Sequence, residues 1–218
     1  MAKKQTTPDR LITYYMDFVL ENGKKPTSVY AFTKLHNLKE EDFYKFYASL
    51  EVLEKEIFKA FFDNTFLLLD KNEEYHTYNP KNKLLSFYFS FFELLTANRS
   101  YVVQTLKGKE SNLKSLSVLQ HLRTAFISYI KQLQIEVPKI ENKSVSKFQN
   151  KSFEEAAWIQ LLLTLKFWLD DTSPSFEKTD IFIEKSLQAG FDLIDIKPFQ
   201  NILDFGKFII KERTNFTV

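Results

Sequence analysis

Apolar residues recur at helical spacing along most of the chain. Near the N-terminus, Ile12, Tyr15, Met16 and Val19 follow an i, i+3, i+4, i+7 pattern, which gives a helix over 9–22 a single apolar face. The same spacing, together with residues that begin or end helices, predicts further helices over 28–35, 39–47, 50–70, 80–97, 99–107, 113–135, 152–170, 176–194 and 198–212. No segment shows a convincing strand pattern, so we predict an all-α fold of nine to ten helices.

Polar residues mark helix starts and connecting loops. Ser49 stands where it would cap the long helix that follows it, and Ser152 with Glu155 three residues later matches a capping box. Two polar stretches, 71–80 and 136–151, are predicted to be loops. The second is the longest polar stretch and therefore the best candidate for a mobile loop.

The composition excludes several classes of chemistry. The chain has no Cys, which rules out disulfides and thiolate metal sites. Its 4 Gly residues form no Gly-rich phosphate loop and no GxSxG nucleophile motif. The three His residues, His36, His76 and His121, are scattered, and none has a second ligand at metal-binding spacing. The sequence therefore predicts a protein that is not an enzyme and that uses no cofactor or metal.

The charges nearly cancel, with 30 basic and 28 acidic residues and a net charge of +2. This balance is not that of a protein that binds nucleic acid through bulk charge alone. The longest strongly apolar runs, 84–92 and 156–165, are about ten residues long, short of the ~20 that a membrane-spanning helix needs. The apolar stretch 11–20 contains Asp17 and lacks a signal-peptide cleavage site. We expect a cytoplasmic protein without an integral membrane span.

A set of helix ends and helix starts follows a fixed order over 21–58. The first helix ends in a Gly turn, and a Thr-Ser-Val sequence begins the second helix. An aromatic cluster lies in the third helix, and a Leu-Glu sequence begins the fourth. The residues of this set are Gly23, Thr27, Ser28, Val29, Phe43, Tyr44, Tyr47, Leu50, Glu51 and Leu53. This set resembles the N-terminal DNA-binding domain of TetR-family transcriptional regulators. The resemblance implies a TetR-type fold, with a helix-turn-helix module over 1–48 and a ligand-binding and dimerisation domain over 49–218.

The same resemblance implies a homodimeric regulator that binds operator DNA and responds to a ligand. The residues that it implies as DNA contacts are hydroxyl, aromatic and basic side chains of the module: Thr27, Lys34, Lys39, Tyr44 and Lys45.

The expected recognition helix departs from the family, because it opens with Glu40, Glu41 and Asp42. Carboxylates repel DNA phosphates, so weak or absent DNA binding is the expectation. Two other interpretations stay open. Acidic residues at a helix N-terminus interact favourably with the helix dipole, and a carboxylate can also accept a hydrogen bond from N4 of cytosine.

Aromatic residues are frequent, with 23 Phe in the chain. Phe58, Phe62 and Phe66 recur at every fourth position. Such a stripe is either core packing or the lining of an apolar cavity, and the TetR-type architecture favours a cavity for a small apolar ligand or lipid. The expected ligand contacts are Phe58, Phe62, Phe87, Phe91, His121, Trp158 and Leu162.

A turn between two expected helices carries a second set of ordered residues. They are Trp168, Leu169, Asp171, Ser173, Pro174, Thr179, Phe182, Ile183, Glu184 and Lys185. The set resembles the C-terminal signature of the TetR-like lipid-binding accessory proteins of ubiquinone biosynthesis. It implies an alternative function, a lipid- or isoprenoid-binding accessory protein that keeps the TetR-type fold and does not bind DNA.

Helices 152–170 and 176–194 are expected to form the dimer interface, as a four-helix bundle across a twofold axis. The expected seam is the four-residue repeat of Ile183, Leu187 and Phe191. The last predicted helix, 198–212, has a broad apolar face that is interpreted as a core or dimer surface or, alternatively, as a membrane-facing one.

Overall fold

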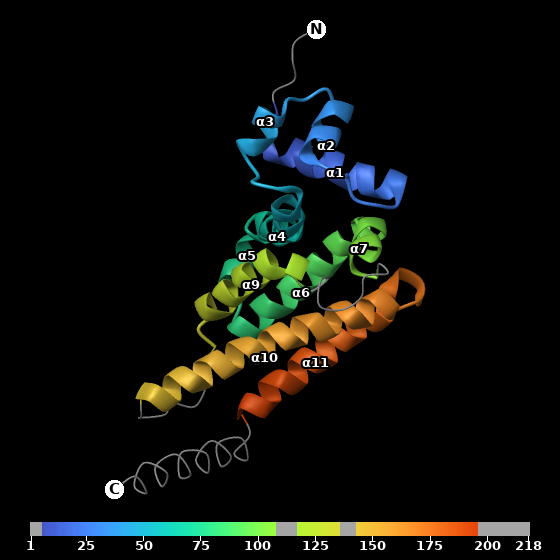
Figure 1. Cartoon of the computed structure of the whole chain (residues 1–218). Helices are drawn as coiled ribbons and strands as arrows, with labels where there is room; N and C mark the ends of the chain where they lie inside the picture. The colour runs from blue at the N-terminus through green and yellow to red at the C-terminus, as the bar shows by residue number, and fades with distance from the viewer. Residues whose placement is uncertain (1–5, 108–116, 136–142, 196–218) are drawn as a thin grey trace, which may run out of the picture. The chain divides into compact units, whose positions relative to one another are not determined.

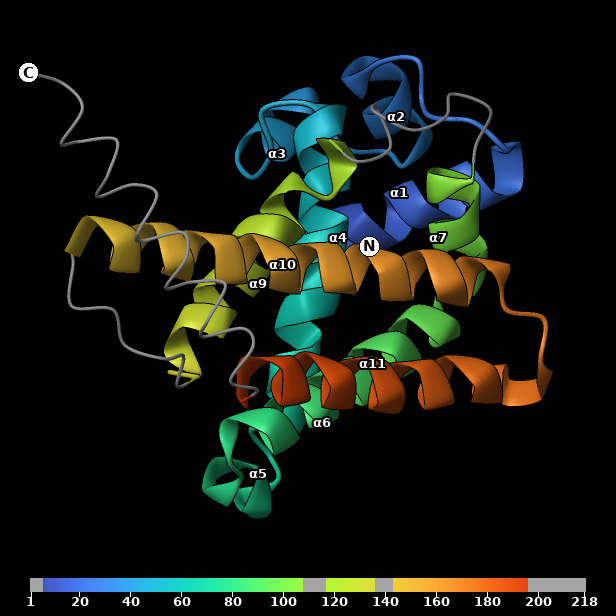
Figure 2. The same cartoon turned by 90° about the horizontal axis from the view of Figure 1, so that it is seen from below.

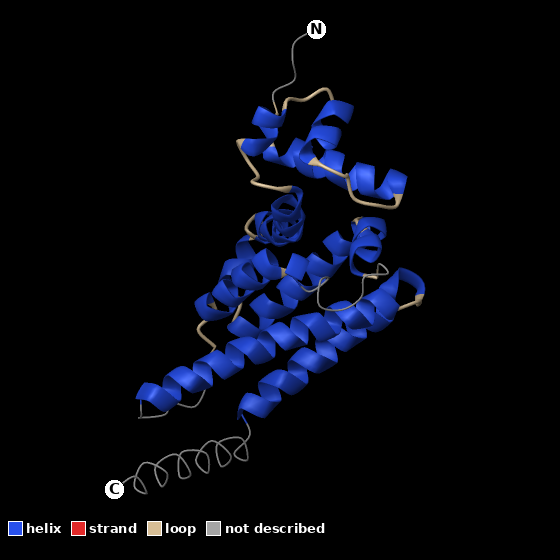
Figure 3. Cartoon of the chain, in the orientation of Figure 1, coloured by secondary structure: helices blue, strands red, loops and turns tan. Residues whose placement is uncertain are grey.

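The computed structural model describes residues 6–107, 117–135 and 143–195. Within these ranges the regular structure consists of ten α-helices and one short 3₁₀ turn, and none of the described residues forms a strand (Figure 3). The predicted all-α class and the predicted number of helices are therefore confirmed. The predicted helix over 198–212 lies outside the described residues.

Four helices lie at the N-terminal end of the chain, and three of them begin at a hydroxyl side chain. The four helices are α1 (Pro8–Asn22), α2 (Val29–Leu35), α3 (Glu40–Tyr44) and α4 (Leu50–Leu69) (Figure 1). The hydroxyl oxygens of Thr7, Ser28 and Ser49 each accept a hydrogen bond from a backbone N–H in the first turn of α1, α2 and α4, which satisfies a donor that has no partner within the helix. The predicted cap at Ser49 is confirmed, whereas α3 ends at Tyr44 and is shorter than the predicted helix over 39–47.

The remaining helices follow the predicted order, with two corrections. They are α5 (Glu73–Thr77), α6 (Pro80–Ala97), α7 (Arg99–Leu106), α9 (Gln120–Gln132), α10 (Lys143–Asp170) and α11 (Glu177–Asp195), with the 3₁₀ turn Pro174–Phe176 before α11. Of the predicted helix over 113–135, residues 113–116 lie outside the described part of the chain.

The first correction concerns 71–80, which is not wholly a loop because it contains α5. The side chain of Asn72 accepts a hydrogen bond from the Glu74 N–H at 3.0 Å and caps this short helix. Tyr75 is buried, so a single ring attaches the helix to the core. A polar segment is thus helical because one cap and one buried side chain hold it.

The second correction concerns the predicted helix start at Ser152, which is wrong. Helix α10 begins at Lys143 and runs without interruption to Asp170. Residues 143–151, predicted as part of a mobile loop, are therefore helical. A capping box requires its first residue to lie outside the helix, and Ser152 lies well inside it.

The chain divides into two compact units, 1–71 with 90–126 and 72–89 with 127–218. The first unit joins the predicted 1–48 module to α4 and α7, and α1 packs along α7. Its core is mainly aromatic, with Tyr15, Phe32 and Phe43 fully buried and in edge-to-face contact. The functional boundary after residue 48 stays a prediction.

The second unit is built around α10 and α11, which pack side by side as an antiparallel hairpin (Figure 2). Both tryptophans of the chain, Trp158 and Trp168, lie on α10 and are buried. In the same unit the hydroxyl groups of Tyr75 and Tyr129 form a hydrogen bond at 3.1 Å, and the ring of Phe87 packs on Tyr129 at 5.3 Å. These contacts connect α5, α6 and α9.

Candidate functional site

Helices α2 and α3 pack together as a helix-turn-helix. The turn between them has Asn37 in the left-handed region at φ 54°, a conformation that Asn tolerates better than most residues. The Leu38 N–H donates to the Thr33 carbonyl at 2.8 Å and closes the turn. The rings of Phe32 and Phe43 meet edge-to-face at 6.0 Å, so an apolar contact fixes α3 against α2.

The residues predicted to contact DNA all lie at the surface of this module. Thr27, Lys34 and Tyr44 are exposed, and the Lys34 ammonium lies 5.4 Å from the centre of the Tyr30 ring. Lys39 forms an ion pair with Glu41. The structure therefore brings the predicted residues together on one module, but it also brings acidic side chains among them.

Both lysines that flank α3 are paired with its acidic residues. The Lys39 Nζ–Glu41 Oε1 distance is 2.9 Å, and the Lys45 Nζ–Asp42 Oδ1 distance is 2.7 Å. The hydrogen bond from Lys39 lowers the pKa of Glu41, and the hydrogen bond to Asp42 raises the pKa of Lys45. Both pairs are therefore ionised at neutral pH, and a phosphate that approaches either lysine competes with a carboxylate.

His36 lies in a stack of rings beside the same turn. Its imidazole is parallel to the Tyr14 ring at 4.3 Å and meets Phe32 edge-on at 5.0 Å. The buried Nε2 atom has no hydrogen-bond partner. Burial lowers the pKa of His36, while the carboxylates of Asp17 and Glu21 act in the opposite direction. Burial of the ring in this stack thus favours the neutral imidazole.

The predicted ligand contacts are divided between the two units. Four of them, Phe58, Phe62, Phe91 and His121, belong to the first unit, and Phe87, Trp158 and Leu162 belong to the second. The phenylalanines and Trp158 are buried. Phe58 packs on Phe61 and Tyr101, at 6.0 and 6.4 Å between ring centres, as a core side chain does. The ligand role of the whole set stays a prediction.

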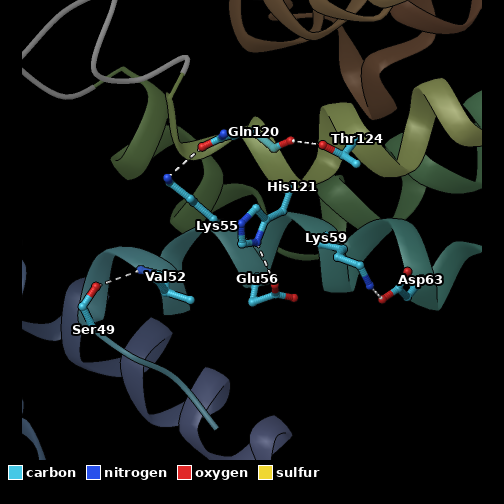
Figure 4. A network of polar contacts seen from close by, with 9 residues as sticks. All are labelled: Ser49, Val52, Lys55, Glu56, Lys59, Asp63, Gln120, His121 and Thr124. Atoms are coloured by element: carbon cyan, nitrogen blue, oxygen red, sulfur yellow. Dashed lines mark hydrogen bonds and ion pairs between the residues drawn. The ribbon is translucent and has the colours of Figure 1, made fainter. Parts of the chain in front are cut away.

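His121 differs from the apolar members of that set. Its Nδ1 atom lies 2.7 Å from the Glu56 carboxylate, and about a third of each side chain is exposed. Figure 4 shows this contact between α4 and α9, next to the hydrogen bond from Lys55 to Gln120. The hydrogen bond with Glu56 accounts for the position of His121.

Among the described residues, the α10–α11 hairpin carries one stripe of buried apolar side chains and one stripe of exposed ones. Ile183 and Leu187, predicted to form the dimer seam, are 0% and 5% exposed within the single chain, and Phe191 is partly exposed. The uncovered stripe consists of side chains that the sequence pattern did not single out, and all are between 37% and 54% exposed: Ile159, Leu163, Phe167 and Ile181.

A groove lies on this uncovered stripe. The rings of Phe167 and Phe182 stack across the two helices at 4.5 Å with an angle of 11° between their planes. The groove is lined by Phe167, Lys178, Ile181, Phe182, Lys185 and Ser186. The four-residue spacing of Ile159, Leu163 and Phe167 was the signal in the sequence that could have identified this surface.

The turn between α10 and α11 is fixed by one buried carboxylate. Asp171 accepts hydrogen bonds from the backbone N–H and the hydroxyl of both Ser173 and Thr179, at distances between 2.7 and 3.0 Å. Burial opposes ionisation of Asp171, but these hydrogen bonds outweigh it and lower its pKa to about 2. Asp171 and Ser173, polar residues of the second resemblance, thus hold the turn before α11 to Thr179 in the first turn of that helix.

Across the ranges 6–107, 117–135 and 143–195, no group of His, Asp or Glu side chains is placed to hold a metal ion. In the same ranges, no helix has the length and the apolar character needed to cross a membrane.

One family model, described as the tetracyclin repressor-like C-terminal domain, matches residues 83–209. This match covers more than half of the chain and includes α7, α9, α10 and α11. The all-helical fold and the helix-turn-helix that precedes the matched domain agree with this match. The chain belongs to the TetR (tetracycline repressor-like) family. No curated protein matches it.

Proposed function

We propose that this chain is a dimeric TetR-family transcriptional regulator that contacts DNA through α2 and α3 and responds to an apolar ligand. The observation that carries the proposal is the helix-turn-helix of α2 and α3, which precedes a domain matched by the family model. Thr27, Lys34 and Tyr44 are exposed on that module and supply candidate contacts to phosphates.

The ion pairs of α3 limit the expected DNA affinity. Lys39 and Lys45 reach phosphates only after they leave Glu41 and Asp42. The described part of the module, 6–49, carries equal numbers of basic and acidic residues, so no excess charge compensates for the loss. We therefore propose weak binding at physiological salt, with a low salt dependence because few counterions are released.

The experiment measures anisotropy of labelled DNA from upstream of the gene at several salt concentrations. A variant that combines Glu41→Gln with Asp42→Asn releases Lys39 and Lys45. It is expected to bind more tightly than the wild type, and its salt dependence should steepen by roughly 0.9 for each additional phosphate that the protein neutralises. Glu73→Gln, which removes an exposed charge from the first turn of α5, is the matched control and should change neither quantity.

The outcomes separate the electrostatic part of the proposal from the rest. A wild-type complex that is sequence-specific and tighter than micromolar at about 150 mM salt contradicts the limit that we assign to α3. If neither the wild type nor the double variant binds any DNA, the regulator proposal fails.

The proposed dimer uses the uncovered stripe of Ile159, Leu163, Phe167 and Ile181. These apolar side chains are exposed on two helices that pack together, and exposed apolar patches mark association surfaces. A twofold axis would place a second hairpin against the first and complete a four-helix bundle. We therefore move the predicted seam from Ile183 and Leu187 to the exposed stripe, because those two side chains are already buried within the protomer.

The proposed ligand is apolar, because the predicted contact residues other than His121 are aromatic or aliphatic. Native mass spectrometry of the purified protein should reveal an apolar adduct. A fatty acid or isoprenoid added at about 100 times its dissociation constant should raise the melting temperature by roughly 5–11 °C. Phe91→Trp should abolish this rise if it fills a cavity. If it instead destabilises the protein by about 1–3 kcal/mol and no lipid shifts the melting temperature, the phenylalanines are core packing.

The second candidate is the lipid-binding accessory protein that does not bind DNA. The observation that favours it is the pairing of Lys39 and Lys45 with the acidic residues of α3. A bound lipid together with no DNA binding by the Glu41→Gln, Asp42→Asn variant would select this candidate.

A further inference from the structure

One acidic side chain of the first unit is buried in the middle of α4. Glu54 is 5% exposed, although carboxylates are almost never buried unless they are paired. Its neighbours along the apolar face of α4 are core residues such as Leu53, Ile57 and Phe58. A carboxylate in this position must be compensated by specific partners, because burial of an unpaired charge is strongly unfavourable.

Two partners from outside α4 compensate the Glu54 charge. The Tyr15 hydroxyl of α1 donates to Glu54 Oε1 at 2.7 Å, and Lys25 Nζ lies 2.6 Å from Oε2. Burial, and then the nearby Glu54 charge, raise the pKa of Tyr15, so the phenol keeps its proton and remains a donor. Lys25 belongs to the loop over 23–28 that joins α1 to α2. The buried carboxylate therefore holds the loop that leads into the helix-turn-helix.

A second contact holds the same loop from α7. The Gln104 side-chain amide donates to the Gly23 carbonyl at 3.0 Å, while the Gly23 N–H donates to the Val19 carbonyl at 2.9 Å. Gly23 has φ +65°, the left-handed conformation that ends many helices and that glycine adopts at little cost. Pro26, between the two contacts and α2, is buried. The loop is thus attached to α4 and to α7 through separate side chains.

Helix α7 is also within the electrostatic reach of Glu54. Tyr101 of α7 is 1% exposed and so lies in the core of the same unit. Burial, and then the Glu54 charge, raise the pKa of Tyr101. The buried charge of Glu54 on α4 therefore acts on a tyrosine of α1 and on a tyrosine of α7.

We propose that Glu54 and Gln104 are positioning residues that fix the loop over 23–28, and with it α2 and α3, on α4 and α7. The two contacts act as separate tethers of this loop, one to α4 through Lys25 and Glu54 and one to α7 through Gln104. This inference concerns the position of the module and stands without DNA binding. Its consequence for DNA affinity rests on the proposed function.

The test is hydrogen exchange of the full-length protein, with the wild type compared with Lys25→Met and Gln104→Leu. Amides over 23–35 are expected to exchange at least about tenfold faster in Lys25→Met, as loss of a hydrogen bond to a charged group implies, while amides of α10 and α11 keep their rates. Gln104→Leu should give a smaller acceleration in the same segment. Lys25→Arg should restore the wild-type rates, because it keeps the ion pair.

Two comparisons distinguish a tether from general stabilisation. Lys59→Met removes the exposed Lys59–Asp63 ion pair on the same helix and should leave exchange over 23–35 unchanged. In the double variant Lys25→Met, Glu54→Gln, the melting temperature should recover because the unpaired charge is gone, yet exchange over 23–35 should remain fast. Equal acceleration in every segment, or full recovery of protection in the double variant, would overturn the proposal.

DNA affinity is measured in parallel on the same variants. Faster exchange over 23–35 in a protein that binds no DNA supports the tethers and counts against the proposed function. Unchanged exchange over 23–35 in a protein that binds DNA contradicts the tethers and supports the proposed function.

Discussion

The surface of α3 and the uncovered face of α10 and α11 are both candidate interfaces, yet they meet their surroundings differently. The α3 surface carries charges that already have partners in the same chain, as in the Lys45–Asp42 ion pair. The α10–α11 face carries apolar side chains, such as Leu163, that are exposed to water. A partner of α3 must replace contacts that exist, whereas a partner of α10 and α11 only has to exclude water.

This difference implies different behaviour in association. Exposed ion pairs contribute little to stability and are screened by salt, so binding through α3 should be weak and tunable by charge. Burial of apolar area contributes about 25 cal/mol per Å² and is not screened. We therefore expect α10 and α11 to associate permanently and α3 to bind transiently.

The largest expected effect comes from charges introduced on the two stripes of the hairpin. Leu187→Asp places a carboxylate in the core of the second unit and should destabilise the protein by on the order of 4 kcal/mol. Leu163→Asp places the same group on the exposed stripe, so the fold should persist while the dimer dissociates. Light scattering coupled to size exclusion and thermal unfolding measure the two effects.

The two variants control for each other, because they introduce the same residue on neighbouring helices. If the Leu187→Asp variant is folded but monomeric, the dimer interface lies on the stripe of Ile183 and Leu187 that the sequence predicted. A wild-type protein that is monomeric at tens of micromolar would contradict the dimer altogether.

An intermediate effect is expected at the turn that joins the two helices. Asp171→Ala removes the acceptor for Ser173 and Thr179 and should destabilise the protein by about 1–3 kcal/mol, or roughly 2–4 °C in melting temperature for each kcal/mol. Because the folded-state pKa of Asp171 is about 2, below its ordinary value of 3.8, this stabilisation is complete above about pH 4–5 and is lost as the pH falls towards 2.

Thermal unfolding of wild type and variant between pH 2 and 7 checks this expectation, since their difference should vanish in acid. Asp170→Ala is the matched control. Asp170 is the adjacent exposed carboxylate, 3.5 Å from Lys166, and its loss should matter little. An equal effect of the two substitutions would show that the turn does not depend on Asp171.

The smallest effect is expected at His36 in the N-terminal module. Burial lowers its folded-state pKa below the ordinary value of 6.5, so folding favours the neutral ring. The stabilisation is present above about pH 6.5 and is lost as the pH falls below that value. His36→Phe keeps an aromatic ring beside Tyr14 but cannot titrate.

Urea unfolding at several pH values between 5 and 7.5 measures this difference. The wild type should lose more stability than His36→Phe on acidification, while His76→Gln, at an exposed position on α5, should follow the wild type. If the stabilities of the wild type and His36→Phe change in parallel with pH, burial of His36 does not contribute to the pH dependence of stability.

Local signals in the sequence were sufficient for most helix boundaries. Ser49 caps α4 and Pro80 begins α6 as predicted, because both act within one turn of the backbone. The start of α10 was not predictable in this way. Residues 143–151 are too polar to show an apolar face, and Ser152 and Glu155 happen to have capping-box spacing inside a helix.

Contacts between residues that are distant in sequence could not be predicted from these local signals. Glu54 appears in the sequence as an ordinary polar position of α4, and its partner Lys25 lies 29 residues away. Periodicity likewise identified Ile183 and Leu187 as apolar positions, but it does not say whether an apolar stripe faces its own core or a second chain. That assignment depends on how α10 packs on α11, which the spacing of residues does not specify.

The location of both tryptophans on α10 makes the protein's own fluorescence selective. Trp158 and Trp168 are buried in the second unit, so their emission reports the packing around α10, whereas circular dichroism reports the helices of both units. Unfolding curves recorded by the two methods coincide only if the units melt as one cooperative body. The unlabelled wild-type protein thus contains its own probe for whether the helix-turn-helix and the family-matched domain lose structure together.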